Sequence, residues 1–263
     1  MKVAGKVVLI SGGGTGIGAA CARAFAEAGA HVAILGRRRD LIDSVAAEVG
    51  GLALVADAAQ APDMRRVVDL VTRQLGGLDT LIANAGGHGL GAALETDDES
   101  WDRARKANLD TAFVAAREAL PALIARRGSI IVISSIAGLA AGPEVCGYTT
   151  FKHALIGLTR SLARDYGPQG VRVNAVCPGW VRTPMADEEM QPLMRERGIT
   201  LDEAYALVTA NVPLRRAAQP AEIASICQFL ASEAASIVTG AVIVADGGST
   251  IVDVPTLAFG APA

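Results

Sequence analysis

Residues 7–18, Val7-Val8-Leu9-Ile10-Ser11-Gly12-Gly13-Gly14-Thr15-Gly16-Ile17-Gly18, place an apolar run directly before a glycine-rich loop. The apolar run is typical of a buried strand, and an Ala-rich stretch with helical spacing follows Gly18. Glycines allow a tight turn and a close backbone approach, and free N–H groups at a helix start attract anions. This order predicts that Ser11, Gly12, Gly14, Thr15, Gly16, Ile17 and Gly18 bind the pyrophosphate of a dinucleotide. The alternative is a simple glycine-rich turn. A P-loop is excluded because no Lys-Ser or Lys-Thr pair follows.

The same alternation of strand and helix continues along the chain. Short apolar runs occupy residues 7–10, 32–35, 52–55, 81–82, 130–133, 171–173 and 242–244. Helix-like segments lie between them, at about 16–29, 38–49, 62–75, 98–126, 147–167 and 220–231. Apolar strands separated by helices imply a parallel sheet covered on both faces. We therefore predict a doubly wound α/β fold of about seven strands, in a single domain spanning residues 1–263, with ligands at the carboxyl ends of the strands.

One segment interrupts the alternation. Residues 185–215 are polar, contain Met and Arg, and have a helical pattern between two late strands. A substrate lid and a surface excursion are both compatible with this pattern.

Composition limits the classes of partner. The 263 residues are 51% hydrophobic and carry a formal net charge of −3, which gives no general attraction to nucleic acid or anionic membranes. The glycines after Ile10 interrupt a signal-peptide-like start, and no apolar stretch is long enough to span a bilayer. The four cysteines lie far apart with no metal-ligand spacing, which predicts free thiols in a reducing compartment, the cytoplasm, and no metal site.

The residues after the second and third strands bear on the cofactor. An acid at the end of the second strand commonly holds an adenosine ribose, whereas an arginine there can accommodate a 2′-phosphate. Here Arg37 and Arg38 follow Gly36 with no carboxylate, which favours NADP(H) over NAD(H). The alternative is that these arginines are only the solvated start of a helix. Asp57, beside Ala58, is placed either to accept from an adenine amino group or to begin a helix.

Tyr148 and Lys152 are four residues apart in a predicted helix and so share one face. A cation ~4 Å from a phenol, at an effective dielectric of ~20, supplies about 4 kcal/mol, enough for a pKa drop of ~3 units. The pair therefore predicts a general acid/base near neutral pH. We expect further polar residues at the same crevice, namely Ser135, Asn84-Ala85-Gly86 and Asn108. Taken singly, Ser135 could be a helix cap, Asn84-Ala85-Gly86 a turn and Asn108 a polar helix position.

Taken together, these motifs resemble the short-chain dehydrogenase/reductase family over residues 5–250. The set comprises Gly12-x-x-x-Gly16-Ile17-Gly18, Asn84-Ala85-Gly86, Asn108, Ser135, Tyr148-x-x-x-Lys152, Pro178-Gly179 and Asp246-Gly247-Gly248. Ser11 stands where the family usually has Thr, which keeps the hydroxyl.

The resemblance implies an oxidoreductase that moves a hydride between a nicotinamide cofactor and an alcohol or ketone, and the arginines after the second strand favour NADP(H) as that cofactor. It implies that Tyr148 exchanges the substrate proton, Ser135 steadies the substrate oxygen, Lys152 lowers the Tyr148 pKa and binds ribose hydroxyls, and Asn108 holds a relay water. It assigns the cofactor groove and the nicotinamide end to Asn84, Ala85, Gly86, Pro178, Gly179, Val181 and Thr183. It also implies a homotetramer. An NAD-dependent alcohol dehydrogenase and a non-catalytic dinucleotide sensor are the alternatives.

The substrate pocket is expected around the residues that follow these motifs. The residues are His88, Ser135, Glu144, Val145, Trp180 and Met185, with Leu90 and Pro143 nearby. We expect an apolar pocket with one polar handle, supplied by His88 or Glu144, unless His88 is a solvated loop residue.

Overall fold

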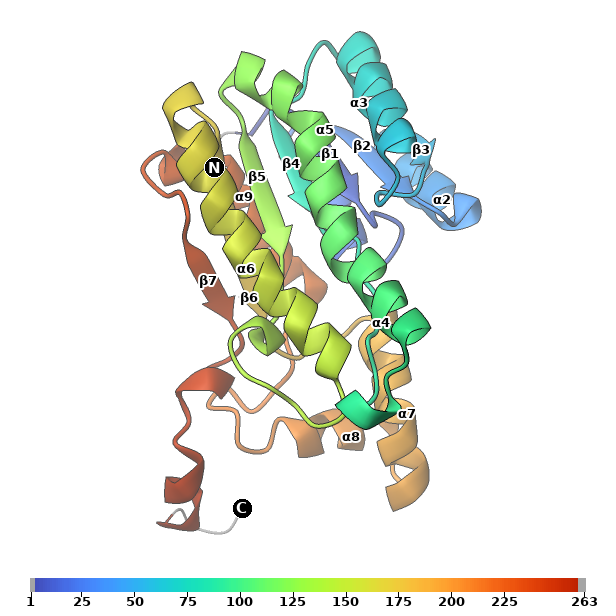
Figure 1. The fold of residues 1–263 in the computed structure, drawn as a ribbon, viewed down its shortest axis with the longest axis vertical. Coiled ribbons are helices and arrows are strands. Elements are labelled where there is room, and N and C mark those ends of the chain that lie inside the picture. The colour runs from blue at the N-terminus through green and yellow to red at the C-terminus, as the bar shows by residue number, and fades with distance from the viewer. Residues whose placement is uncertain (1–2, 260–263) are drawn as a thin grey trace.

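A seven-stranded parallel sheet organises residues 3–259, the part of the chain that the computed structural model describes (Figure 1). The strand order is β3-β2-β1-β4-β5-β6-β7, and every neighbouring pair is parallel. The strands are β1 (Val7–Ser11), β2 (His31–Gly36), β3 (Leu52–Val55), β4 (Thr80–Ala83), β5 (Ser129–Ile133), β6 (Arg172–Pro178) and β7 (Val242–Ala245). This confirms the predicted doubly wound α/β fold in one domain.

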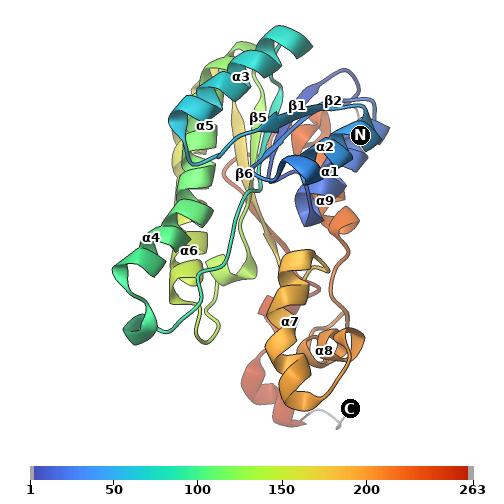
Figure 2. The same cartoon turned by 90° about the vertical axis from the view of Figure 1, so that its right-hand side faces the viewer.

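Helices cover both faces of the sheet (Figure 2). Helices α3 (Ala61–Leu75), α5 (Thr111–Arg126) and α6 (Cys146–Tyr166) pack on one face. Helices α1 (Gly16–Glu27), α2 (Arg39–Val49) and α9 (Pro220–Ala231) pack on the other. Alternate residues of the central strands enter the two cores, as Leu9 and Ile10 of β1 do. Burial on both faces explains why the strands are continuously apolar.

The strand order reverses between β1 and β4, because β2 and β3 lie on one side of β1 and the later strands on the other. The register pairs Leu9 of β1 with Ala33 of β2 and with Leu81 of β4. A reversal of this kind opens a crevice at the carboxyl ends of the two central strands. The loops after β1 and β4 therefore border the place where a doubly wound sheet binds its ligand.

The predicted helix over residues 98–126 differs from the structure. Helix α4 (Asp98–Arg105) gives way to a π-helical turn over Lys106–Asp110, and α5 follows it. π-helical turns inside helices frequently mark functional sites, and this one contains Asn108. The strand expected at 171–173 is also longer, since burial continues through Pro178.

Two further helices, α7 (Pro184–Arg197) and α8 (Leu201–Val208), extend beyond the carboxyl ends of the strands (Figure 2). They share a small core of Ala186, Met190, Ala204, Tyr205 and Ala217. The helical pattern predicted for residues 185–215 is therefore confirmed.

None of the helices within residues 3–259 combines the length and apolar character needed to cross a membrane. Cys21, Cys146, Cys177 and Cys227 are free, as predicted, and all but Cys146 are buried.

Candidate active site

The glycine loop closes tightly between β1 and α1. Gly12 and Gly16 adopt left-handed backbone conformations, with φ of +66° and +52°. A Cβ at Gly18 would collide with the Gly12 carbonyl oxygen, and a Cβ at Gly13 would lie 2.6 Å from Ile34 Cγ2. Helix α1 begins at Gly16, with Thr15 at its N-cap position and no side-chain cap. The loop thus presents uncapped helix N–H groups beside a backbone surface free of Cβ atoms, a cradle that fits a pyrophosphate.

Ser11 and Asn84 join the ends of β1 and β4. Ser11 Oγ accepts hydrogen bonds from the backbone N–H groups of Asn84 and Ala85, each at 3.0 Å. Asn84 Nδ2 donates to the carbonyl oxygens of Ser11 and Gly12, each at 3.1 Å. Both polar side chains are therefore engaged within the protein, and they shape the crevice by holding its two walls together.

Tyr148, Lys152 and Ser135 come together at the carboxyl end of β5. Lys152 is 5% exposed; its Nζ donates to the Ile133 carbonyl at 3.2 Å and lies 5.4 Å from the centroid of the Tyr148 ring. Ser135 caps a 3-10 turn, where its Oγ accepts from Ala137 N at 3.1 Å, so the capping role considered from the sequence is present. The same hydroxyl is close enough to the phenol to act on the Tyr148 pKa.

Asn108 reaches this cluster from the π-helical turn. It is 1% exposed; its Oδ1 accepts from Gly87 N at 3.2 Å, and its Nδ2 donates to the Ala104 carbonyl at 3.0 Å. A Cβ at Gly86 would lie 3.4 Å from Asn108 Oδ1 and 3.6 Å from Lys152 Nζ. Gly86 therefore adjoins both Asn108 and Lys152.

The expected fall in the Tyr148 pKa is wrong for this structure. Burial raises the pKa of Tyr148 to about 12, and the Ser135 hydroxyl opposes only part of the rise. Burial also lowers the pKa of Lys152 to about 8, because a charged ammonium is costly in a desolvated position. The cost of desolvating both groups therefore outweighs the attraction between a Lys152 ammonium and a Tyr148 phenolate, which was expected to lower the Tyr148 pKa.

At the end of β2, where the sequence predicts an adenosine site, Arg37 and Arg38 are exposed, and neither forms an ion pair with any residue from 3 to 259. Asp57 Oδ1 accepts from Ala59 N at 3.0 Å, and its Oδ2 lies 3.5 Å from Lys106 Nζ. The Ala58 side chain is buried in the core. Asp57 thus stabilises its own turn and contacts Lys106.

The segment after β6 crosses toward the glycine loop. Pro178 ends the strand, Gly179 N donates to the Ala245 carbonyl at 3.1 Å, and Val181 is buried. Thr183 Oγ1 accepts from Ala186 N at 3.2 Å and caps α7. A Cβ at Gly16 would lie 3.1 Å from Thr183 Cγ2, so Thr183 lies directly against the glycine loop.

The predicted pocket residues fall into different roles. His88 contacts α7, with Nδ1 3.2 Å from Glu189 Oε1. Glu144 is exposed with φ of +54°, and its carbonyl accepts from Gly91 N at 2.7 Å, next to the bridge between Gly91 and Val145. Trp180 packs against the core shared by α7 and α8, whereas Met185 is half-buried one turn before Glu189.

Sequence reasoning missed two residues. Ser134 is buried, and its Oγ donates to the Lys152 carbonyl at 2.9 Å, which holds α6 against β5. The pairing of two adjacent serines after a strand was the only available signal. Glu189 gave no local signal, because its partner His88 is 101 positions away.

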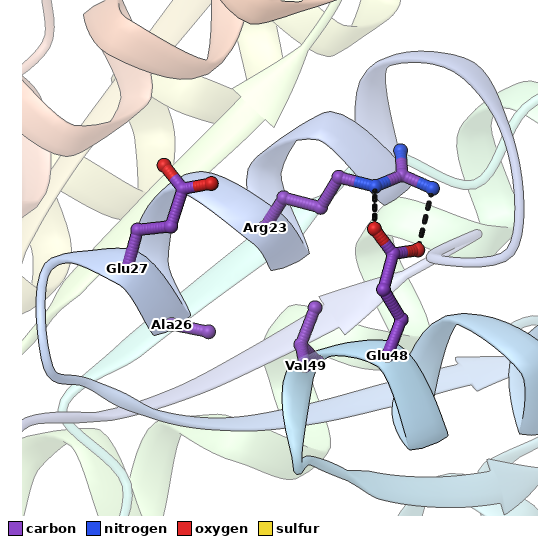
Figure 3. Close-up of a pocket in the computed structure, with 5 residues that line it drawn as sticks. All are labelled: Arg23, Ala26, Glu27, Glu48 and Val49. Carbon is purple, nitrogen blue, oxygen red and sulfur yellow. Dashed lines mark hydrogen bonds and ion pairs between the residues drawn. The ribbon is translucent and has the colours of Figure 1, made fainter.

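Two surface cavities lie apart from this cluster. One, of about 260 Å³, lies between α1 and α2 and contains the bidentate pair of Arg23 with Glu48 (Figure 3). The other, of about 380 Å³, borders α8 and includes Arg182, Arg215 and Arg216. Neither is lined by Tyr148, Ser135 or Lys152.

Comparison with known proteins gives consistent results over nearly the whole chain. A family model described as enoyl-(acyl carrier protein) reductase matches residues 12–250. The protein MoaE of Klebsiella aerogenes is 55% identical over 259 residues, covering 97% of this chain and 99% of MoaE. The meso-2,3-butanediol dehydrogenase of Serratia marcescens is 35% identical, covering 96% of this chain and 98% of the dehydrogenase.

Solved structures agree in fold. The crystal structure of an actinorhodin polyketide ketoreductase with NADPH has a TM-score of 0.88 and 30% sequence identity, covering 94% of this chain and 98% of the ketoreductase.

Proposed function

The chain belongs to the short-chain dehydrogenase/reductase family of oxidoreductases, and on that premise we propose that Tyr148 is the general acid/base for interconversion of an alcohol and a ketone. The observation that carries the proposal is the convergence of Tyr148, Ser135, Lys152 and Asn108 at the carboxyl end of β5. A bound nicotinamide dinucleotide supplies or accepts the hydride.

In this proposal, the Tyr148 phenol exchanges a proton with the substrate oxygen, and Ser135 Oγ donates a hydrogen bond that positions that oxygen. Because the Tyr148 pKa is raised to about 12, the phenol is protonated at neutral pH and is ready to donate to a ketone. Lys152 Nζ lies over the phenol ring and beside Gly86, a position from which it can also donate to ribose hydroxyls. Asn108, which holds the Gly87 backbone, is assigned the relay water in this proposal.

We propose NADP(H) as the preferred cofactor. Arg37 and Arg38 directly follow β2, where an adenosine 2′-phosphate would lie, and they are exposed. Guanidinium groups without a carboxylate partner suit a phosphate. The similarity to a ketoreductase with NADPH agrees with this choice. The glycine loop, Asn84 with Ala85 and Gly86, and the segment from Pro178 to Thr183 would complete the groove.

Residues 185–215 are proposed as a substrate lid. Helices α7 and α8 stand beyond the strand ends with a small core of their own, joined to the sheet through the segment after β6. A separate core lets the two helices move together, and the contact between His88 and Glu189 lies between this unit and the loop after β4.

A homotetramer is proposed for the assembled protein. Apolar side chains are exposed on α5, α9 and β7 and on the C-terminal segment, where an oligomer would bury them. They are Phe113, Phe229, Val244, Ile251, Val254, Leu257 and Phe259.

The test of the proposed function is turnover by the purified protein. NADPH and NADH binding is titrated by fluorescence, and a panel of ketones and secondary alcohols is followed at the nicotinamide absorbance. Tight NADPH binding with ketone reduction is the expected result. Cofactor binding without turnover over the panel would contradict the proposal.

A further inference from the structure

A carboxylate outside the family motifs lies at the edge of the Tyr148 site. Glu189 is on α7, and its Oε1 is 3.2 Å from His88 Nδ1. Its side chain is 32% exposed, whereas that of the neighbouring Glu188, 3.5 Å from His88 Nε2, is 74% exposed. Glu189 is therefore more covered than Glu188, although both contact the same imidazole.

The backbone links this contact to Tyr148 directly. His88 precedes Gly89, whose carbonyl accepts from Tyr148 N at 3.2 Å. A Cβ at Gly89 would lie 2.5 Å from that nitrogen, so the chain beside His88 packs on the start of α6. His88, the residue before Gly89 in the chain, contacts Glu189 through its side chain. Met185 lies one helical turn from Glu189 on α7.

The charge of Glu189 acts on the site. Its carboxylate contributes to the raised pKa of Tyr148. Burial raises the pKa of Glu189 itself, and the contact with His88 opposes this rise. Within residues 3–259, the His88 imidazole is the only basic group in contact with the Glu189 carboxylate. An ionised Glu189 would place a negative charge at this edge of the site, which a substrate cation could balance.

We propose that Glu189 is a specificity-determining residue that favours alcohols or ketones bearing a positively charged amino group over neutral and carboxylate-bearing analogues. The inference rests on the proposed function, because it assigns the substrate class of the same site. A partly desolvated carboxylate attracts a cation a few ångströms away and repels an anion. His88 fixes the direction of the carboxylate through its Nδ1 contact.

The test compares three secondary alcohols that share a CH3–CH(OH)–CH2 unit and differ in the attached group: 1-amino-2-propanol, 2-butanol and 3-hydroxybutyrate. We expect the wild-type kcat/KM to be highest for the amino alcohol and lowest for the carboxylate. In Glu189→Gln, kcat/KM for the amino alcohol should fall about tenfold and that for the carboxylate should rise, with a change below about twofold for 2-butanol. Glu188→Gln, the control on the solvent side of the same helix, should leave the order unchanged.

Calorimetric binding of the three alcohols to the protein with reduced cofactor, which cannot oxidise an alcohol, gives a readout that does not require turnover. The same order of affinities in the wild type would support the proposal even if the variant failed to fold. Equal losses for all three alcohols in folded Glu189→Gln, or a wild type that prefers the carboxylate, would overturn it. Turnover of 2-butanol without charge discrimination would overturn this inference alone, whereas cofactor binding without any turnover would contradict the proposed function.

Discussion

Gly89 lies directly against the backbone of Tyr148: its carbonyl accepts from Tyr148 N at 3.2 Å, and a Cβ there would lie 2.5 Å from that nitrogen. Tyr148 N is one of the first N–H groups of α6, which have no partner within the helix. The loop after β4 therefore satisfies the helix start and sets the position of the phenol.

We predict that Gly89→Ala displaces the start of α6 and lowers kcat by about tenfold to a hundredfold, since a shift near 1 Å can cost that much. The free energy of unfolding should fall by about 1–3 kcal/mol, the usual cost of overpacking. Gly167→Ala, where an added Cβ meets nothing within 4 Å, is the control. Steady-state kinetics and thermal unfolding measure the two effects, and an active, stable Gly89→Ala would contradict the steric argument.

We expect Lys152 to be needed for activity while its buried ammonium lowers the free energy of unfolding. Its pKa falls from the usual 10.5 to about 8, which corresponds to ~3 kcal/mol favouring the neutral form. Between these pH values the unfolded chain binds more protons than the folded one, so stability falls as pH decreases from 10.5 toward 8 and the penalty is complete below 8.

We therefore predict that Lys152→Met raises the free energy of unfolding at pH 7 by about 1–3 kcal/mol while it removes most turnover. The gain should shrink as the pH approaches 10. Chemical unfolding at a series of pH values measures it. At each pH, the free energy of unfolding of Lys152→Met is compared with that of the wild type. If this difference is more favourable to the variant at pH 10 than at pH 7, the ammonium is stabilised in the fold and the prediction is contradicted.

Arg37 should determine cofactor preference. Arg37→Ala is expected to weaken NADPH binding by about tenfold to a hundredfold, because it removes a charge-assisted hydrogen bond to phosphate. NADH binding should change by less than about threefold, since NADH lacks that phosphate. Arg39→Ala, an exposed arginine that begins α2, is the control. Fluorescence titration gives the dissociation constants, and equal losses for both cofactors would refute the phosphate contact.

The assembly is testable by light scattering coupled to size-exclusion chromatography. We expect a mass of four chains. Substituting Phe229 and Val244 together with Asp should yield smaller species, because charges would enter the buried interface. Leu94→Asp, at an exposed residue outside these segments, is the control and should remain tetrameric. A monomeric wild type would contradict the proposed assembly.

Much of the fold was predictable because its signals are local. The glycine loop from Gly12 to Gly18 follows an apolar run immediately, and the pairing of Tyr148 with Lys152 needs only helical spacing. The break at Lys106–Asp110 was not predictable, since nothing in its composition distinguishes a π-helical turn from an α-helix.

Features that depend on distant contacts could not be read from the chain. The contact of His88 with Glu189 joins residues 101 positions apart. The direction of the Tyr148 pKa depends on how deeply the phenol is buried, and burial is a property of the packed structure.

The most direct test of the central claim is the rate of hydride transfer in Tyr148→Phe, measured by stopped flow with saturating NADPH and the best ketone found. Tyr166→Phe, at the far end of the same helix, is the matched control. The account predicts a loss of about a hundredfold to ten-thousandfold in Tyr148→Phe, with NADPH affinity unchanged, and wild-type rates in Tyr166→Phe. Hydride transfer at the wild-type rate in Tyr148→Phe would show that the proton passes through another group.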